Sequence, residues 1–276
     1  MLLLLLAGGW SEGLAQARRS QVLLDARYSS HYQWRGVPRV EQASAQLAAT
    51  GAFGLGQAEH LSLSVWSLLE LSGPGTGDFS VTGDGWTFAE HDFSIQYGTR
   101  SGGLDVTAGV MHYRLNNSAP LGALPPDFNT TEVFGSVSLR EGWLRGLGFT
   151  PTLRAWYDFH RIDGAFTELE LAFSAPVLPV DDPVAGLQLA ARMGASLGQK
   201  AEAGNPGYFT RDGTIYWEGV ASATAGVSWL RVIASYHRLF GIDPVAESAD
   251  PLSNERRSSW GWLEMALSVR FPGGIW

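Results

Sequence analysis

Apolar and polar residues alternate along much of the chain. The first clear segment separates two sets of side chains, Val22, Leu24, Ala26, Tyr28, Tyr32 and Trp34 against Asp25, Arg27, Ser29, His31, Gln33 and Arg35. A strand places two such sets on opposite faces automatically, because its successive side chains point to opposite sides, whereas a helix does not. The segment therefore predicts a β-strand with one apolar face.

The same period-two alternation recurs to the end of the chain. Each segment is roughly 9–13 residues long, which is the length that a tilted strand needs to cross a membrane. About twelve strands are predicted, near residues 22–35, 42–53, 59–71, 88–98, 103–114, 130–139, 150–160, 166–174, 186–198, 214–227, 229–239 and 259–271.

The connections between these segments differ in length. Long ones, rich in Gly, Pro, Asn and Asp, cover 72–87, 115–129, 199–213 and 240–258. The others are mostly shorter, at 54–58, 99–102 and 228, with 140–149 and 175–185 intermediate. Outer-membrane barrels have long outer loops and short periplasmic turns. The pattern predicts an all-β fold, a transmembrane antiparallel up-and-down β-barrel with both termini in the periplasm.

The first residues have a different character. An apolar run of leucines is followed by Ala15-Gln16-Ala17, which fits a secretory signal with a small-residue cleavage site. The run is too short to serve as a membrane-spanning anchor. Residues 1–17 are therefore expected to be a signal peptide, and residues 18–276 a single barrel domain.

Composition narrows the function classes. The mean hydropathy of -0.02 excludes a bundle of transmembrane helices but fits strands that are apolar on one face only. The net charge of -8 argues against nucleic-acid binding, and the absence of cysteine excludes disulfides and thiolate metal sites. Aromatic residues make up 12% of the chain, a composition that suits interfacial belts.

Alternation alone does not say which face points outward, because a soluble barrel of the lipocalin type is apolar inside. Strand number and length favour an apolar exterior, and so does the near absence of lysine, of which Lys200 is the only example. Tyr32 and Trp34 are expected in an aromatic girdle at the lipid interface. The predicted location is the bacterial outer membrane, with its lipid and the barrel-assembly machinery as partners.

The opposite, polar face is expected to line the lumen. Its candidate lumen or constriction residues are Asp25, Arg27, His31, Arg35, Glu90, Asp92, Asp105, Glu132, Arg154, Asp158, Glu168, Glu170, Arg192, Glu218, Arg231, Glu264 and Arg270, joined by His160 and His237. One interpretation is a neutralising network of ion pairs, since buried charges need partners. The other is a charged constriction that selects solutes. The two interpretations are compatible.

The stretch Tyr28-Ser29-Ser30-His31-Tyr32-Gln33-Trp34-Arg35-Gly36-Val37 resembles the opening signature of a family of uncharacterised Gram-negative outer-membrane proteins. In that family the first strand ends in an aromatic-x-Arg-Gly-Val/Ile turn. Val110-Met111-His112-Tyr113 and the segment 129–135 are also similar, so the resemblance covers about the first half of the chain. It implies a barrel and no settled activity. The ending departs from the general outer-membrane pattern, because five residues follow Phe271.

Within this resemblance, Arg35 stands at the predicted first turn. Gly36 can adopt the positive φ of a tight turn, and Pro38 is expected to end the hydrogen-bond ladder. Arg35 would then lie just inside the outer mouth, with its guanidinium on a carboxylate of a neighbouring strand. The alternative is a solvated loop arginine.

Two functions follow from this picture. The first is a passive channel for small hydrophilic solutes, with a weak cation preference because acidic side chains outnumber arginines in the lumen. The second is a closed structural or surface-interaction barrel that acts through its outer loops. No enzyme, cofactor or metal site is expected. Glu168 and Glu170 could form a carboxylate pair but suit lumen polarity better, and Asp78 and Asp84 lack regular calcium-ligand spacing.

Overall fold

The structure is a computed structural model that describes residues 20–40, 43–71, 87–115, 129–177, 184–202, 207–246, 248–249 and 256–272. The predicted signal peptide, the loop aspartates Asp78 and Asp84 and the last four residues lie outside these ranges. Within the described part of the chain, no helix is long and apolar enough to cross a membrane.

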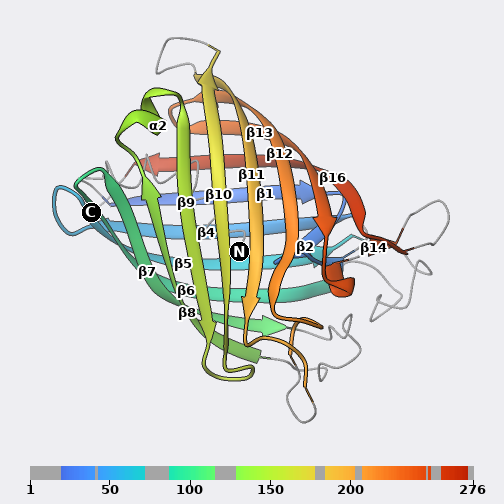
Figure 1. The fold of residues 1–276 in the computed structure, drawn as a ribbon. Coiled ribbons are helices and arrows are strands. Elements are labelled where there is room, and N and C mark those ends of the chain that lie inside the picture. The colour runs from blue at the N-terminus through green and yellow to red at the C-terminus, as the bar shows by residue number, and fades with distance from the viewer. Residues whose placement is uncertain are drawn as a thin grey trace.

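Twelve antiparallel strands close into one barrel (Figure 1). Each strand pairs with its neighbour along the chain, and the last strand closes onto the first, which confirms the predicted up-and-down barrel. The barrel strands are β1 (Gln21–Ser29), β4 (Ser44–Gly54), β5 (Glu59–Glu70), β6 (Thr87–Ser101), β7 (Leu104–Leu115), β8 (Asn129–Leu139), β9 (Phe149–Asp158), β10 (Gly164–Pro176), β11 (Val184–Leu197), β12 (Gly213–Val227), β13 (Leu230–Gly241) and β16 (Ser259–Pro272).

The two ends of the barrel differ. At the turn end, Gln21 lies opposite Pro272, and the strands are joined by shorter connections, one of which holds α2 (Trp143–Gly146). The loop end carries the small elements β2 (Tyr32–Trp34), β3 (Val37–Val40), η1 (Pro244–Ala246), β14 (Ser248–Ala249) and β15 (Arg256–Arg257). We call the barrel portions next to these ends the turn half and the loop half.

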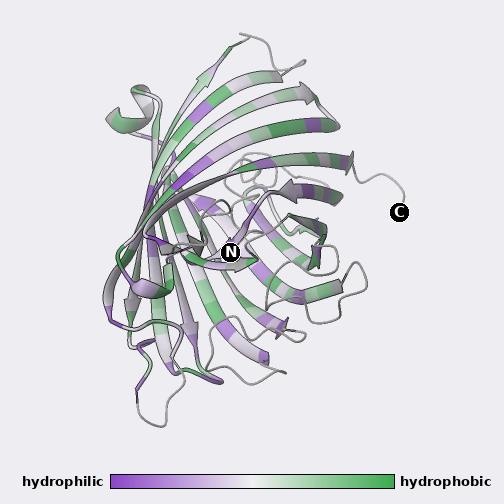
Figure 2. Ribbon diagram, turned by 90° about the vertical axis from the view of Figure 1, so that its right-hand side faces the viewer, coloured by the Kyte–Doolittle hydropathy of each residue, from purple (hydrophilic) through white to green (hydrophobic). Residues whose placement is uncertain are grey.

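The outer wall is apolar, as the alternating hydropathy along the strands shows (Figure 2). Large side chains such as Leu24, Val65 and Leu263 are exposed on it. Exposed aromatic residues lie toward both ends of the strands, Trp217 and Phe240 at the loop end and Trp229 and Phe271 at the turn end. A closed barrel with an apolar belt between aromatic girdles is the form in which strands span a membrane, and it occurs in the bacterial outer membrane. The protein is therefore an outer-membrane β-barrel with its apolar face toward lipid.

The predicted first strand is wrong in its last part. β1 ends at Ser29, and the chain bends inward to form a separate hairpin of β2 and β3. Tyr32 and Trp34 are only 3% and 4% exposed, so they do not belong to the lipid-facing girdle. The error has a physical cause. The hairpin strand alternates in the same phase as β1, so the period-two pattern continues across the bend.

Candidate functional site

The β2–β3 hairpin turns on two residues, Arg35 and Gly36. Their φ angles are 50° and 81°, so both adopt the positive values that a tight two-residue hairpin turn requires. Pro38 lies opposite Gln33 within the hairpin, so the expectation that Pro38 ends the ladder is wrong. Proline is tolerated there because the hairpin forms its own two-stranded sheet, in which both strands are edges.

The hairpin packs into an aromatic core inside the loop half. The ring of Trp34 lies 4.6 Å from that of Tyr208 and 6.4 Å from that of Tyr113, both edge-on. The ring of Tyr32 lies 5.6 Å from that of Trp66 on β5. Val37, on the second strand of the hairpin, is completely buried. The hairpin is therefore a plug that fills the loop half from within.

Arg35 fixes the tip of this plug. Its guanidinium donates two hydrogen bonds to the carboxylate of Glu132 on β8, one of them 2.8 Å long from Nη1 to Oε1, and both side chains are fully buried. Its Cζ lies 4.4 Å from the ring centre of Trp34, 5.1 Å from that of Trp156 and 5.2 Å from that of Phe166. A two-pronged ion pair enclosed by aromatic faces is a strong and directional contact. Arg35 therefore binds a carboxylate of another strand, as expected, and Glu132 is that carboxylate.

Tyr216 on β12 links the plug to the barrel wall. A Cβ atom on Gly36 would lie 2.2 Å from Cδ1 of Tyr216, and one on Gly194 would lie 2.2 Å from its Cε1. The ring therefore occupies the space that two missing side chains leave. Its hydroxyl donates a 2.5 Å hydrogen bond to Glu168. Sequence reasoning did not select Tyr216, because nothing in the pattern connects the three positions.

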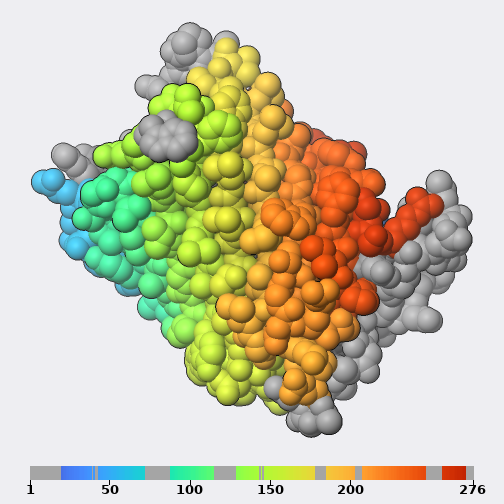
Figure 3. Space-filling view, in the orientation of Figure 1, coloured from blue at the N-terminus to red at the C-terminus, as the bar shows by residue number. Residues whose placement is uncertain are grey.

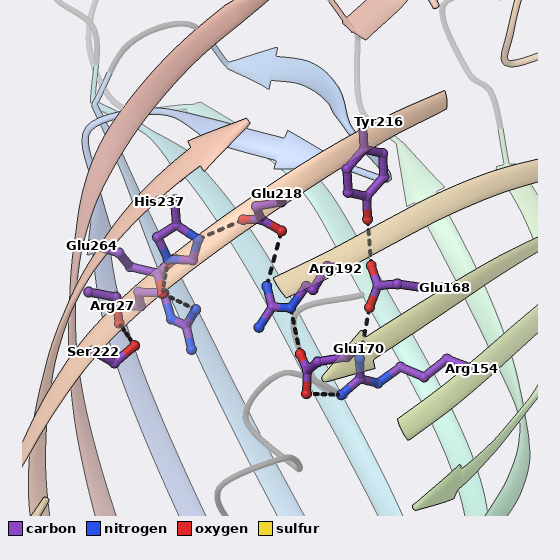
Figure 4. A network of polar contacts seen from close by, with 11 residues as sticks. Arg27, Arg154, Glu168, Glu170, Arg192, Tyr216, Glu218, Ser222, His237 and Glu264 are labelled. Carbon is purple, nitrogen blue, oxygen red and sulfur yellow. Dashed lines mark hydrogen bonds and ion pairs between the residues drawn. The ribbon is translucent and has the colours of Figure 1, made fainter. Parts of the chain in front are cut away.

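Next to Tyr216, a continuous row in which glutamates alternate with arginines and one histidine follows the inner wall from β9 through β10, β11, β12, β13 and β16 to β1 (Figure 4). We call it the charge ladder, and its members are Arg154, Glu168, Glu170, Arg192, Glu218, His237, Glu264 and Arg27.

The contacts within the ladder are short. Arg154 lies 2.8 Å from Glu168 and 3.3 Å from Glu170, measured between nitrogen and oxygen atoms. Arg192 lies between two glutamates. Its Nε is 2.5 Å from a carboxylate oxygen of Glu170, and its Nη1 is 3.2 Å from one of Glu218.

His237 continues the ladder through its two ring nitrogens. Nδ1 lies 2.7 Å from Glu218 and Nε2 lies 3.9 Å from Glu264, which also binds Arg27. Neighbouring charges of opposite sign offset the cost of burying each other. Glu168 and Glu170 are therefore ladder members that share Arg154, and both are ion-paired residues of the lumen wall.

The remaining predicted residues of the loop half lie around the plug. Asp158 accepts hydrogen bonds from Thr130 at 2.8 Å and from the hydroxyl of Tyr208 at 2.9 Å. Burial raises the pKa of Tyr208 well above its ordinary value, so the hydroxyl keeps the proton that it donates. Glu90 and Asp92 are buried on the inner face of β6.

Two histidines lie at the margin of the plug. The ring of His31 is 5.8 Å from that of Trp260. His160 is exposed in the connection after β9, so the prediction that it lines the lumen is wrong. β9 ends at Asp158, and His160 is two residues further along the chain. It therefore fits the even-numbered inward pattern of β9 in the sequence without belonging to the strand.

The turn half is lined differently. Hydroxyl pairs such as Ser222 with Ser235 at 2.9 Å line its inner wall. Asp25 accepts a hydrogen bond from Ser268, and Asp105 binds Arg100 at 2.6 Å and Arg140 at 2.7 Å.

Several inward-facing side chains of the turn half are partly exposed. Thr107, Thr224, Arg231 and Arg270 all show this intermediate burial. Solvent therefore reaches these positions of the turn half, although other inward residues there, such as Ser62 and Ser268, are buried, whereas Arg35 and Val37 of the plug are fully buried. Among the residues with described placement, no group of three or more His, Asp or Glu side chains could hold a metal ion.

Comparison with known proteins identifies the fold. LpxR from Salmonella typhimurium aligns with 91% of this chain and 99% of its own at 11% identity and a TM-score of 0.52. The NanC porin aligns with 89% of this chain and 98% of its own at 8% identity and a TM-score of 0.49. An outer membrane channel from Pseudomonas putida F1 aligns with 93% of this chain and 98% of its own at 10% identity and a TM-score of 0.47.

This chain has the fold of the outer-membrane β-barrels. No family model and no curated protein matches its sequence. At such low identities the solved structures show the fold alone. The resemblance to the uncharacterised family and the expectation that the protein is not an enzyme therefore stay predictions.

Proposed function

We propose that the protein is a channel for small hydrophilic solutes that rests in a closed state, with the β2–β3 hairpin as its plug. The observation that carries this proposal is the complete burial of Arg35 and Val37 inside the barrel. No water-sized path touches these residues, whereas solvent reaches polar side chains of the turn half such as Thr224. Burial of the hairpin in the loop half, together with partly exposed polar residues in the turn half, fits a channel that is closed at its loop end. The plug would have to move before solutes pass.

The second candidate is a closed barrel that acts through its outer loops. The charge ladder favours it, because a row of paired charges below the plug ties the inner wall together whether or not the plug moves. The two candidates differ in what lies beyond the plug. A channel needs a continuous path once the plug is removed, and a closed barrel does not.

Recording from single barrels in planar bilayers separates them. We expect the native protein to give no steady conductance, and a variant with residues 31–40 replaced by a short Gly-Ser link to give one. The matched control replaces the turn-end connection 55–58 in the same way and should stay closed. A folded variant without the hairpin that still fails to conduct would overturn the channel proposal in favour of the closed barrel. Steady conductance of the native protein would refute the resting plug.

The ion preference of the opened variant is a finer point. We propose a weak preference for cations, because the inner wall carries more carboxylates than arginines. Most of these carboxylates, such as Glu170 and Glu218, already bind arginines. The preference should therefore be small. The reversal potential in a salt gradient measures it, and an anion-selective potential would contradict the proposal.

A further inference from the structure

The outer wall carries a groove that the proposed channel does not use. It has a volume of about 670 Å³ and spans the lipid-facing side from β10 to β1. Its floor is made of alanines, among them Ala223, which lies directly opposite Ala234. Taller side chains, Leu189, Tyr236 and Leu263, stand around it. Figure 3 views the wall formed by β9 to β12 in yellow-green to orange.

Short side chains cause this hollow. Alanines on the adjacent strands β12 and β13 leave the backbone nearly bare, while the flanking strands carry leucine and methionine. The lining is apolar and lies in the belt that faces hydrocarbon. An empty hollow there would lose the dispersion contacts of its lining atoms, so the groove favours an apolar chain as its occupant.

Among the described residues, one cation, Arg238, lies beside the groove. Arg238 follows Tyr236 on the same outward face of β13, one outward step closer to the loop end. It is exposed, its Cζ lies 5.9 Å from the ring centre of Phe240, and it makes no hydrogen bond with the described residues. Those residues supply no carboxylate within ion-pair distance. An arginine at the edge of the hydrocarbon needs an anion, because an uncompensated charge is costly there.

The surroundings of Arg238 leave room for such an anion. Its partners on the neighbouring strands are Gly219 and Gly261, and the space over Gly261 is taken by the hydroxyl of Tyr236, so Arg238 is open on the Gly219 side. A Cβ on Gly219 would meet nothing within 4 Å. Arg238 lies three residues from Gly241, the end of β13, which is roughly 10 Å along the strand from the loop end. Phe240, one outward step nearer the loop end, belongs to the exposed aromatic girdle that marks the membrane interface, so Arg238 lies next to that interface.

We propose that the groove binds an acyl chain of an anionic, phosphate-bearing membrane lipid, and that Arg238 binds the lipid phosphate. The chain runs from Tyr236 over Ala234 and Ala223 toward the turn end. The lipid phosphate supplies the negative charge that the described residues do not place next to Arg238. This makes the wall at β12 and β13 a lipid site, independent of whether the lumen conducts.

Native mass spectrometry of the refolded barrel tests the proposal, with phosphatidylglycerol compared with diacylglycerol of the same chains. We expect phosphatidylglycerol to bind about five-fold more tightly, the factor that one arginine near a membrane surface contributes. Arg238→Gln should remove that preference. Arg114→Gln, at an equally exposed outward position on β7, is the matched control and should keep it.

The groove itself is tested by filling it. Ala223→Leu together with Ala234→Leu should weaken the binding of both lipids, because the added side chains occupy the floor. Ala155→Leu, at an exposed position on β9, is the control and should leave binding unchanged. Both changes point into open space, and gel heat-modifiability confirms that the barrels fold.

Three results would overturn the lipid site. The first is equal loss of preference in the Arg238 and Arg114 variants, which would mean a general attraction to the rim. The second is undiminished binding in the filled groove. The third is a dimer of the chain whose contact is the groove, because a second copy would then be the occupant.

Discussion

The loop half and the turn half of this barrel are built from the same strands but filled in opposite ways. In the loop half, inward-facing positions carry large aromatic and charged residues, among which Trp156 and Glu132 are buried. In the turn half the same strands carry small hydroxyl residues, some of them partly exposed, such as Ser136 and Thr224, and others buried, such as Ser62 and Ser268. The number of strands is equal in both halves, so barrel width does not explain the difference.

The inserted hairpin explains it. A barrel of this size is wide enough to hold more than its own side chains. The loop half fills the extra space with β2 and β3, while the described residues form no such insert in the turn half. Closure is therefore a property of one short segment and of the few residues that hold it, Arg35, Glu132 and Tyr216. The predictions below change one half and use the other as reference.

The largest effect is expected from Arg35→Ala. Removing the guanidinium leaves the buried carboxylate of Glu132 without a partner, which costs about 3–5 kcal/mol of unfolding free energy. The unfolding temperature on heat-modifiability gels should fall clearly. Arg35→Ala combined with Glu132→Ala should recover part of the loss, because the double variant has no stranded charge. An unchanged unfolding temperature for Arg35→Ala would show that the ion pair does not hold the plug.

A smaller effect is expected from Gly36→Ala. The new methyl group would overlap the ring of Tyr216, and the positive φ of 81° strains any residue with a Cβ. Such strain costs about 1–3 kcal/mol. Adding Tyr216→Ala should relieve the overlap but not the strain of the turn. If Gly36→Ala is as stable as the native protein by urea titration, the turn does not press on the wall.

The smallest effect is expected in the turn half, from Ser222→Ala. This change removes one hydrogen bond to Ser235 in a wall that solvent reaches, so the cost should be about 1 kcal/mol or less. Urea titration against Arg35→Ala gives the contrast between the halves. A loss as large as that of Arg35→Ala would mean that the turn half is packed as tightly as the plug.

The alternation of the sequence predicted the barrel closely, because every spanning strand must be apolar on one side and polar on the other. Of the two placements that it left open for Arg35, a carboxylate partner and a solvated loop, the structure shows the first. It failed at Tyr32 and Trp34, because a hairpin inside the lumen alternates as a membrane strand does. The available signal was Gly36, because a glycine inside an alternating segment can mark a tight hairpin turn, although arginine is not among the residues that usually precede such a glycine.

The sequence did not predict which residues pair with each other in the site. Arg35 and Glu132 are 97 residues apart, and Arg27 and Glu264 are 237 apart. Such pairs depend on barrel closure and on strand register, which set which inward positions share a level. The contact of Tyr216 with Gly36 depends in addition on a space that only the folded plug creates.

Access to the turn-half lumen tests the central claim most directly. The chain has no cysteine, so Thr224→Cys provides a single thiol on the inner wall of the turn half. Arg211→Cys, exposed at the loop end, is the positive control for labelling from outside. A membrane-impermeant maleimide added to whole cells should label the Arg211 variant but not the Thr224 variant. Permeabilising the outer membrane, or replacing residues 31–40, should make the Thr224 variant reactive. Labelling of that variant in whole cells with the hairpin intact would contradict the plugged lumen.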